Sequence, residues 1–305
     1  MTASSTYRSI FRPDLFSGQN LVVTGGGSGI GRCTAHELAS LGAHVILIGR
    51  KVEKLQRVAE EIEEDGGSVE FHSVDIRDEA GVQATVKTIL QANDRVHGLV
   101  NNAGGQFPSP VQAISAKGFD AVIRTNLMGG FLMAREFFNQ HFSKHGGNIV
   151  NMLADMWNGM PGMAHSGAAR AGMLNLTKTT AIEWAPQGVR VNAVAPGWIA
   201  SSGMDTYGGA VKAMIPELKK KVPMRRLGTE AEVSAAICFL LSEAASFITG
   251  ECIRIDGAAP LATGMWPMPD HDRAPMYDGF HRSVLPRALG GSGEDDPSND
   301  PSSKA

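Results

Sequence analysis

Short runs of β-branched and other apolar residues alternate along this chain with longer amphipathic stretches. The stretches, such as residues 51–65 and 79–90, carry apolar side chains at helical spacing. This alternation predicts βαβ units, and therefore an α/β fold with a doubly wound parallel sheet and helices on both faces. About seven strands are expected, over residues 21–23, 45–48, 69–74, 99–100, 149–150, 189–195 and 252–255.

The strand–helix pattern covers residues 18–260, which is a normal length for a single domain with this kind of sheet. Residues 1–17 precede it as a short leader, and residues 261–287 follow it as a C-terminal extension. Residues 288–305 are rich in Gly, Ser, Pro and Asp and contain almost no apolar residue. That composition predicts a disordered tail.

Composition excludes several classes of protein. The formal net charge of the 305 residues is −3, without the clustered positive charge that nucleic acid requires. The chain has no apolar run of membrane-spanning length and no secretory signal at its start. Its three cysteines have no CxxC spacing, so neither a disulfide framework nor a metal site is predicted. The final Ser-Lys-Ala does not match the Ser-Lys-Leu peroxisomal address, and a cytoplasmic protein is expected.

Glycine is in excess, with 36 of 305 residues, and one cluster stands between the first strand and a helical pattern. Glycines with this spacing allow a tight turn, and the helix that follows directs its free N–H groups toward an anion. We therefore predict a Rossmann-type cradle for a dinucleotide pyrophosphate. Its expected residues are Thr24, Gly25, Ser28, Gly29, Ile30, Gly31 and Arg32.

The spacing GxxxGxG, together with three further motifs in order, resembles the short-chain dehydrogenase/reductase family. The motifs are Asn101-Asn102-Ala103-Gly104, Asn126 and Val194-Ala195-Pro196-Gly197. The resemblance implies that Asn101, Ala103 and Gly104 border the cofactor and that Asn126 supports a catalytic hydrogen-bond relay. It also implies nicotinamide contacts from Pro196, Gly197 and Ile199, a substrate loop over residues 198–226, and a homo-oligomer.

The end of the second predicted strand bears on the choice of nicotinamide cofactor. A carboxylate at this place would bind the ribose of NAD, but the chain has Gly49-Arg50-Lys51. Arg50, with Arg32 nearby, suits a 2′-phosphate, so NADP(H) is predicted. The alternative is that Arg50 and Lys51 are only solvated charges at a helix start. Asp75 resembles the family's adenine-contacting Asp, although a helix-capping Asp fits the sequence as well.

The catalytic segment departs from the family pattern, which is Tyr-x-x-x-Lys preceded by a Ser. Neither Tyr7, Tyr207 nor Tyr277 has a Lys four residues later. Aligning Arg170-Ala171-Gly172 with the usual Lys-Ala-Gly puts Arg170 in the Lys place and Ser166 in the Tyr place. The upstream Ser place falls near Ala154-Asp155.

This exchange changes the chemistry that the pocket can perform. Ser has no pKa near neutrality and Arg stays protonated, so the pocket offers fixed donors instead of an acid–base group. Fixed donors suit the enolate oxygen that forms when hydride adds to an α,β-unsaturated thioester. The segment 165–172 and its surroundings resemble the trans-2-enoyl-CoA reductases of the family, and less closely the 2,4-dienoyl-CoA reductases, which keep Lys.

Each candidate catalytic residue has a functional and a structural interpretation. Arg170 is expected to bind the nicotinamide ribose and polarise the thioester oxygen. Ser166 donates a hydrogen bond to that oxygen or caps a helix. His165 relays a proton or is structural, and Asp155 delivers the α proton or lies on the surface. Tyr207, in the substrate loop, is a rival proton donor.

The sequence therefore predicts an NADPH-dependent reductase of an enoyl thioester, with an acyl-CoA as its small-molecule substrate. The basic stretch that includes Lys219, Arg225 and Arg226 could meet the coenzyme A phosphates or form a solvated helix face. Three other functions stay open: an alcohol or ketone dehydrogenase for a lipid-like or terpenoid substrate, a 2,4-dienoyl-CoA reductase, and a nucleotide-binding protein without catalysis.

Overall fold

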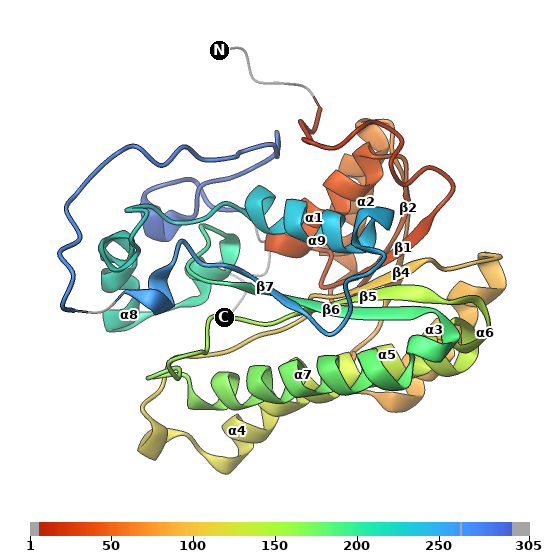
Figure 1. Cartoon of the computed structure of the whole chain (residues 1–305), viewed down its shortest axis with the longest axis horizontal. Coiled ribbons are helices and arrows are strands. Elements are labelled where there is room, and N and C mark those ends of the chain that lie inside the picture. The colour runs from red at the N-terminus through yellow and green to blue at the C-terminus, as the bar shows by residue number, and fades with distance from the viewer. Residues whose placement is uncertain (1–5, 263, 295–305) are drawn as a thin grey trace, which may run out of the picture.

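A computed structural model describes residues 6–262 and 264–294 and shows one seven-stranded sheet, in which all strands are parallel (Figure 1). The strand order is β3-β2-β1-β4-β5-β6-β7. The seven strands predicted from the apolar runs are all present, with bounds that differ by a few residues. They are β1 (Asn20–Thr24), β2 (His44–Gly49), β3 (Ser68–Ser73), β4 (Gly98–Asn101), β5 (Gly147–Met152), β6 (Val189–Pro196) and β7 (Cys252–Ile255).

Helices cover both faces of the sheet, as predicted (Figure 1). One face carries α1 (Gly29–Ser40), α2 (Val52–Glu64) and α9 (Glu230–Leu241). The other carries α3 (Glu79–Ala92), α4 (Ala116–Ile123), α5 (Gly129–Phe137) and α7 (Ala164–Glu183). The short helices are α6 (Ser143–His145) and α8 (Gly209–Met214). The architecture is thus a doubly wound α/β domain.

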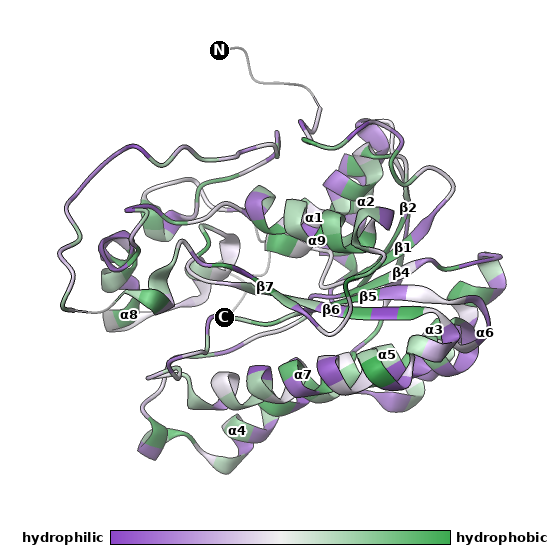
Figure 2. Ribbon diagram, in the orientation of Figure 1, coloured by the Kyte–Doolittle hydropathy of each residue, from purple (hydrophilic) through white to green (hydrophobic). Residues whose placement is uncertain are grey.

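Each face of the sheet has its own apolar core, and hydrophobic segments appear both in the strands and on the helices that cover them (Figure 2). Alternate strand residues go to opposite cores: Leu21 and Val23 pack under α1 and α9, and Val22 packs under α3 and α5. The central strands are therefore buried on both sides, which explains their continuous apolar sequences.

The strand order reverses between β1 and β4, because the chain winds outward in one direction from β1 and in the other from β4. Crossovers on opposite faces leave a crevice at the carboxyl ends of these two strands, and ligands of doubly wound sheets bind there. The predicted glycine-rich turn follows β1 directly. The fold thus places this turn at the edge of the crevice.

The leader and the C-terminal extension both pack onto the domain. Tyr7 and Phe16 of the leader are buried, and the Tyr7 hydroxyl donates a hydrogen bond to the buried Glu37 carboxylate at 3.1 Å. Residues 288–294 differ from the expected disorder, because Ala288 is buried and Glu294 contacts basic side chains. The remainder of the predicted tail, residues 295–305, lies outside the described residues.

No helix within residues 6–262 and 264–294 has the length and apolar character to cross a membrane. The same residues contain no group of three or more His, Cys, Asp or Glu side chains placed to hold a metal ion.

Candidate active site

A cleft of about 570 Å³ opens at the carboxyl ends of β1, β4, β5 and β6. Its walls come from the glycine-rich turn, from the segment after β4, from the first turns of α7, and from the loop after β6. The C-terminal extension closes one side through Arg287 and Glu294. The crevice expected from the strand order is therefore also the largest cavity next to the predicted site residues.

The β1–α1 turn requires glycine for two separate reasons. Gly25 and Gly29 have φ of +67° and +56°, values that strain any residue with a side chain. Gly31 has no room for a Cβ, which would lie 2.2 Å from the Gly25 carbonyl oxygen. Ser28 caps α1 without a side-chain hydrogen bond. The first N–H groups of α1 therefore point into the cleft and can hold a pyrophosphate.

The segment after β4 is fixed by Thr24. Its buried hydroxyl accepts hydrogen bonds from the backbone N–H groups of Asn102 and Ala103, both at 3.0 Å. Asn102, in turn, donates to the Thr24 carbonyl and lines the cleft. Asn101 points elsewhere: it is buried and donates to Asn151 and Gly130. The cofactor wall here is formed by Asn102, Ala103 and Gly104, with Thr24 behind it.

Asn126 also holds the segment after β4 in place. It sits in a π-helical turn (Arg124–Met128) between α4 and α5, an irregularity that often marks functional sites. Its side-chain amide makes two hydrogen bonds with the backbone of Gly105, accepting at 3.1 Å and donating at 2.6 Å. The buried Asn126 thereby holds the loop that carries Gly104 and Gln106.

Arg170 is part of the cleft wall. Its side chain is buried, and its guanidinium donates to the Met152 carbonyl at the end of β5. A Cβ on Gly104 would lie 2.7 Å from Nη2, so the guanidinium covers this glycine closely. Burial lowers the pKa of Arg170 to about 10, which still leaves it charged at neutral pH.

Ser166 and Tyr207 meet through one residue that the motif analysis did not select. The buried Ser166 hydroxyl donates to Gln106 Oε1 at 2.5 Å, and Gln106 Nε2 donates to the Tyr207 hydroxyl at 2.9 Å. Gln106 and Tyr207 both line the cleft. The Gln106 side chain therefore connects the Ser166 hydroxyl to the Tyr207 phenol of the substrate loop.

The two remaining catalytic candidates are not among the residues that line the cleft. His165 is fully buried, its Nδ1 accepts from the Ser166 backbone N–H at 2.8 Å, and its ring packs edge-on against Phe107. Asp155 lies beyond the carboxyl end of β5, and burial together with the nearby Asp256 raises its pKa.

The residues predicted to select the cofactor are largely engaged elsewhere. Arg32, expected near a 2′-phosphate, is buried and pairs with Glu61 on α2 at 2.7 Å. Asp75 is bound by the Arg77 side chain, which lowers the pKa of Asp75 to about 2. Arg50 is exposed at the end of β2 and does not line the cleft. Lys54, on the first turn of α2, does line it.

Most predicted site residues converge on the cleft, and some do not. The ones that line it are Gly25, Ser28, Gly29, Ile30, Gly31, Ala103, Gly104, Arg170, Pro196, Gly197 and Ile199. The ones outside its lining are Thr24, Arg32, Arg50, Asp75, Asn101, Asn126, Asp155, His165 and Ser166. Among the lining residues that had not been predicted are Lys54, Asn102, Gln106 and Glu294. The polar residues of the sequence Asn-Asn-Ala-Gly-Gly-Gln were the available signal for two of them.

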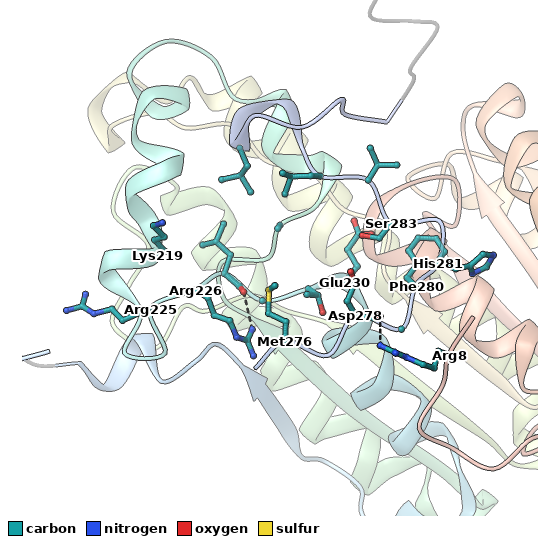
Figure 3. A pocket seen from close by; sticks show the side chains of 18 of the residues that line it. Arg8, Lys219, Arg225, Arg226, Glu230, Met276, Asp278, Phe280, His281 and Ser283 are labelled. Carbon is teal, nitrogen blue, oxygen red and sulfur yellow. Dashed lines mark hydrogen bonds between the residues drawn. The ribbon is translucent and has the colours of Figure 1, made fainter. Parts of the chain in front are cut away.

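A second cavity, of about 850 Å³, lies between the substrate loop and the C-terminal extension (Figure 3). Part of its wall is the basic stretch considered for coenzyme A phosphates. Arg226 there forms a bidentate pair with Glu232, and Arg225 lies 3.4 Å from Asp270. Arg226 also donates hydrogen bonds to the backbone carbonyls of Ala274 and Pro275, so both arginines contact the C-terminal extension.

Comparisons with known proteins agree with this site. A family profile described as enoyl-(acyl carrier protein) reductase matches residues 25–258. The chain belongs to the short-chain dehydrogenase/reductase family. It is 38% identical over 256 residues to a probable 2,4-dienoyl-CoA reductase of Bacillus subtilis, covering 82% of this chain and 97% of that protein. Members of this family are oxidoreductases that use a nicotinamide cofactor, and the glycine turn described above fits such a cofactor.

Two solved structures of the family are also similar. One is a citronellol catabolism dehydrogenase (AtuB) of Pseudomonas aeruginosa PAO1, with 63% identity and a TM-score of 0.76, covering 83% of this chain and 99% of that one. The other is described as an NAD(P)-dependent gluconate 5-dehydrogenase from Beutenbergia cavernae with bound NADP. It is 33% identical with a TM-score of 0.76, over 82% of this chain and 100% of that one.

Proposed function

We propose that this protein uses NADPH to reduce the C2=C3 double bond of an enoyl thioester, with an acyl-CoA as substrate. The observation that carries the proposal is the buried guanidinium of Arg170 in the cleft wall, at the family's Lys place, with Ser166 at its Tyr place. The relative from Bacillus subtilis, named for reduction of a dienoyl-CoA, supports the same class of substrate.

Arg170 suits an oxyanion because its position and charge are both fixed before substrate binds. The Met152 carbonyl occupies one side of the guanidinium, and the N–H of Nε has no hydrogen-bond partner among the described residues. A nicotinamide cofactor supplies the hydride that adds to the β carbon. Negative charge then collects on the thioester oxygen, where a preorganised cation stabilises the transition state more than the ground state.

The α carbon then needs a proton, and Tyr207 is the donor that we propose. Tyr207 lines the cleft, whereas Asp155 and His165 are not among its lining residues. Gln106 donates a hydrogen bond to the phenol, and Ser166 holds Gln106 in place by donating to its Oε1. Hydride addition at the β carbon would break the C2=C3 π bond and leave an enolate. The phenolic proton would then form the α C–H bond while the thioester C=O bond is restored, and a solvent proton would return to the phenolate. The reduction therefore consumes one hydride and one solvent proton and needs no further reagent.

NADP(H) is the cofactor that the electrostatics favour. No carboxylate follows β2, where an acidic residue would repel a 2′-phosphate; the residues there are Arg50 and Lys51. The side chain of Lys54 on α2 lines the cleft nearby. Asp75, the nearest acidic candidate, is neutralised by Arg77 at 2.5 Å. The related structure with bound NADP supports this preference.

A second candidate function is oxidation of a terpenoid or other lipid-like alcohol. Two observations favour it: the 63% identity to a citronellol catabolism dehydrogenase, and a cleft-lining phenol, Tyr207, that could accept a hydroxyl proton. In that reaction Arg170 would take the place of the family's Lys in the cleft wall.

Steady-state assays with a defined substrate panel separate these functions. The purified protein is tested with NADPH against trans-2-enoyl-CoA, 2,4-dienoyl-CoA and a 3-ketoacyl-CoA, and with NADP⁺ against citronellol. We expect NADPH consumption with the enoyl or dienoyl thioester and none with the ketone. The same panel is run with Tyr207→Phe and, as a control, Tyr277→Phe, whose hydroxyl donates to the Arg8 carbonyl far from the cleft.

Each outcome of the panel decides one question. Turnover of citronellol without turnover of any thioester replaces the proposal with the second candidate. Cofactor binding without turnover of any compound assigns the protein to nucleotide binding without catalysis. For the proton donor, Tyr207→Phe should lower kcat about 10²-fold. An equal loss in Tyr277→Phe argues against Tyr207.

A further inference from the structure

One segment of the C-terminal extension forms a wall of both cavities. We call residues 283–294 the strap. Its residues Val284, Leu285 and Leu289 line the outer cavity of Figure 3, whereas Arg287 and Glu294 line the active-site cleft. The strap thus crosses between the two cavities and ends inside the cleft.

The strap places a carboxylate on the amino end of α1. Glu294 Oε1 accepts a hydrogen bond from the Gly29 backbone N–H at 3.3 Å. The same side chain lies 3.6 Å from Arg32 Nη1 and 3.9 Å from Arg57 Nη2, and only 10% of it is exposed. A helix amino terminus with two flanking guanidinium groups is the environment that a phosphate prefers. In this structure, the strap's carboxylate occupies it.

We infer that Glu294 competes with the nicotinamide cofactor for the amino end of α1, so that the strap is an autoinhibitory latch on the cofactor cleft. The Gly29 N–H belongs to the glycine turn that the pyrophosphate approaches, and it already serves the Glu294 carboxylate. Two anions at this point would repel each other at close range. Binding of the cofactor therefore requires that Glu294 leave.

The strap is built so that only its end has to move. Arg282, just before it, pairs with Asp65 at 2.8 Å and Glu64 at 2.9 Å. Asp205 of the substrate loop accepts hydrogen bonds from the backbone N–H groups of Arg287 and Ala288 at 3.1 and 2.8 Å. These contacts fix the strap at both its start and its middle.

A glycine hinge follows this anchored part. Residues 290–293 read Gly-Gly-Ser-Gly, and Gly290 and Gly293 have φ of +86° and +71°. Glycine changes its backbone angles at little steric cost, so the residues after Leu289 can swing while the anchored part stays. The competing carboxylate is the residue that comes directly after this hinge.

A second acidic side chain, Glu230, lies beside the latch. A Cβ on Gly29 would lie 3.7 Å from Glu230 Oε1, so Glu230 is close to the same helix end. Burial, followed by the charge of Glu294, raises the pKa of Glu230. Above about pH 8, where Glu230 ionises, its charge repels Glu294 and weakens the latch.

The test compares cofactor affinity between two charge-neutralising variants of the full chain. Dissociation constants for NADPH and for NADH are measured by cofactor fluorescence in wild type, Glu294→Gln and Glu63→Gln. Glu63 is an exposed residue of α2 and serves as the matched control. We expect Glu294→Gln to bind both cofactors about fivefold more tightly, because a competing state is weakened. Glu63→Gln should bind as wild type does.

Hydrogen–deuterium exchange of the wild-type chain supplies a second readout that needs no substitution. The Gly293 amide donates to the Leu285 carbonyl at 3.1 Å when the latch is closed. Saturating NADPH should therefore speed exchange in the peptide that contains Gly293. Unchanged or weaker affinity in Glu294→Gln, or slower exchange with NADPH, overturns the inference. Neither readout involves the acyl substrate, so failure here leaves the proposed reaction untouched.

Discussion

The exchange of a lysine for Arg170 is the residue-scale feature with the largest chemical consequence. A buried lysine readily loses its proton, whereas a guanidinium remains charged even where burial lowers the pKa of Arg170 to about 10. The cost of burying that charge is partly offset by the Met152 carbonyl. A permanently charged group in a dry wall is suited to an anion that appears only during the reaction.

Replacing Arg170 should therefore affect turnover more than binding. We expect Arg170→Ala to lower kcat/KM with trans-2-enoyl-CoA by roughly 10²- to 10³-fold, or about 2–4 kcal/mol of transition-state stabilisation. Arg170→Lys should recover part of the loss, because a point charge replaces the planar fork. The exposed Arg124→Ala is the control for loss of one positive charge. Equal kcat/KM in Arg170→Ala and wild type would remove Arg170 from the mechanism.

At the scale of elements, the β1–α1 turn shows how a sequence motif becomes a site. The glycine spacing alone predicted Gly25, Gly29 and Gly31, and the structure shows a steric reason why each of them is glycine. Such positions are predictable because only glycine satisfies the backbone there. The seven strands were predictable for a similar reason, since strands buried on both faces must be apolar throughout.

The Gly31 position offers a direct test of this turn. In Gly31→Ala the new Cβ would lie 2.2 Å from the Gly25 carbonyl oxygen and 2.4 Å from Asn102 Nδ2. Either the turn or the Asn102 loop must move, so NADPH affinity should fall by at least about tenfold. Titration of NADPH fluorescence measures the affinity. Gly66→Ala, at an open α2–β3 turn with φ of +82°, controls for a general loss of stability.

Side-chain direction accounts for what the motifs could not supply. Arg32 belongs to the glycine turn in sequence, but its shortest ion pair is with Glu61 on α2, and it does not line the cleft. Asn101 likewise belongs to the cofactor motif, yet it points into the core, and its neighbour Asn102 faces the cleft. Contacts that span many residues, such as Gln106 with Tyr207 and Glu294 with Gly29, leave no periodic signal in a single sequence.

For the whole molecule, the balance of buried carboxyl groups sets the pH range of stability. Pairing with His36 and Arg32 outweighs burial and lowers the pKa of Glu61 to about 2, so its contribution is lost as pH falls below about 4.5. Asp75 behaves in the same way beside Arg77. Burial instead raises the pKa of Glu37 and Glu230. The free energy of unfolding should therefore have a maximum and should decline at both lower and higher pH.

Glu230 is the clearest case on the alkaline side. Burial, with the nearby Glu294 charge, raises its pKa from 4.5 to about 8. Between these values the unfolded chain ionises Glu230 and the folded chain does not, so unfolding releases a proton and stability falls as pH rises. Glu230→Gln keeps the shape without the charge. Its free energy of unfolding, measured by urea denaturation, should gain roughly 1–3 kcal/mol on wild type between pH 5 and pH 8.5.

The dependence on pH distinguishes this effect from a simple packing change, because a packing change would shift both pH values equally. Glu63→Gln, exposed on α2, should show no such trend. The prediction also connects the fold to the latch, since removing the Glu230 charge removes one source of repulsion on Glu294. Glu230→Gln should therefore close the latch more firmly and weaken NADPH binding above pH 8, opposite to the effect of Glu294→Gln. A gain in stability that is the same at pH 5 and pH 8.5 would contradict a raised pKa of Glu230 in the folded chain.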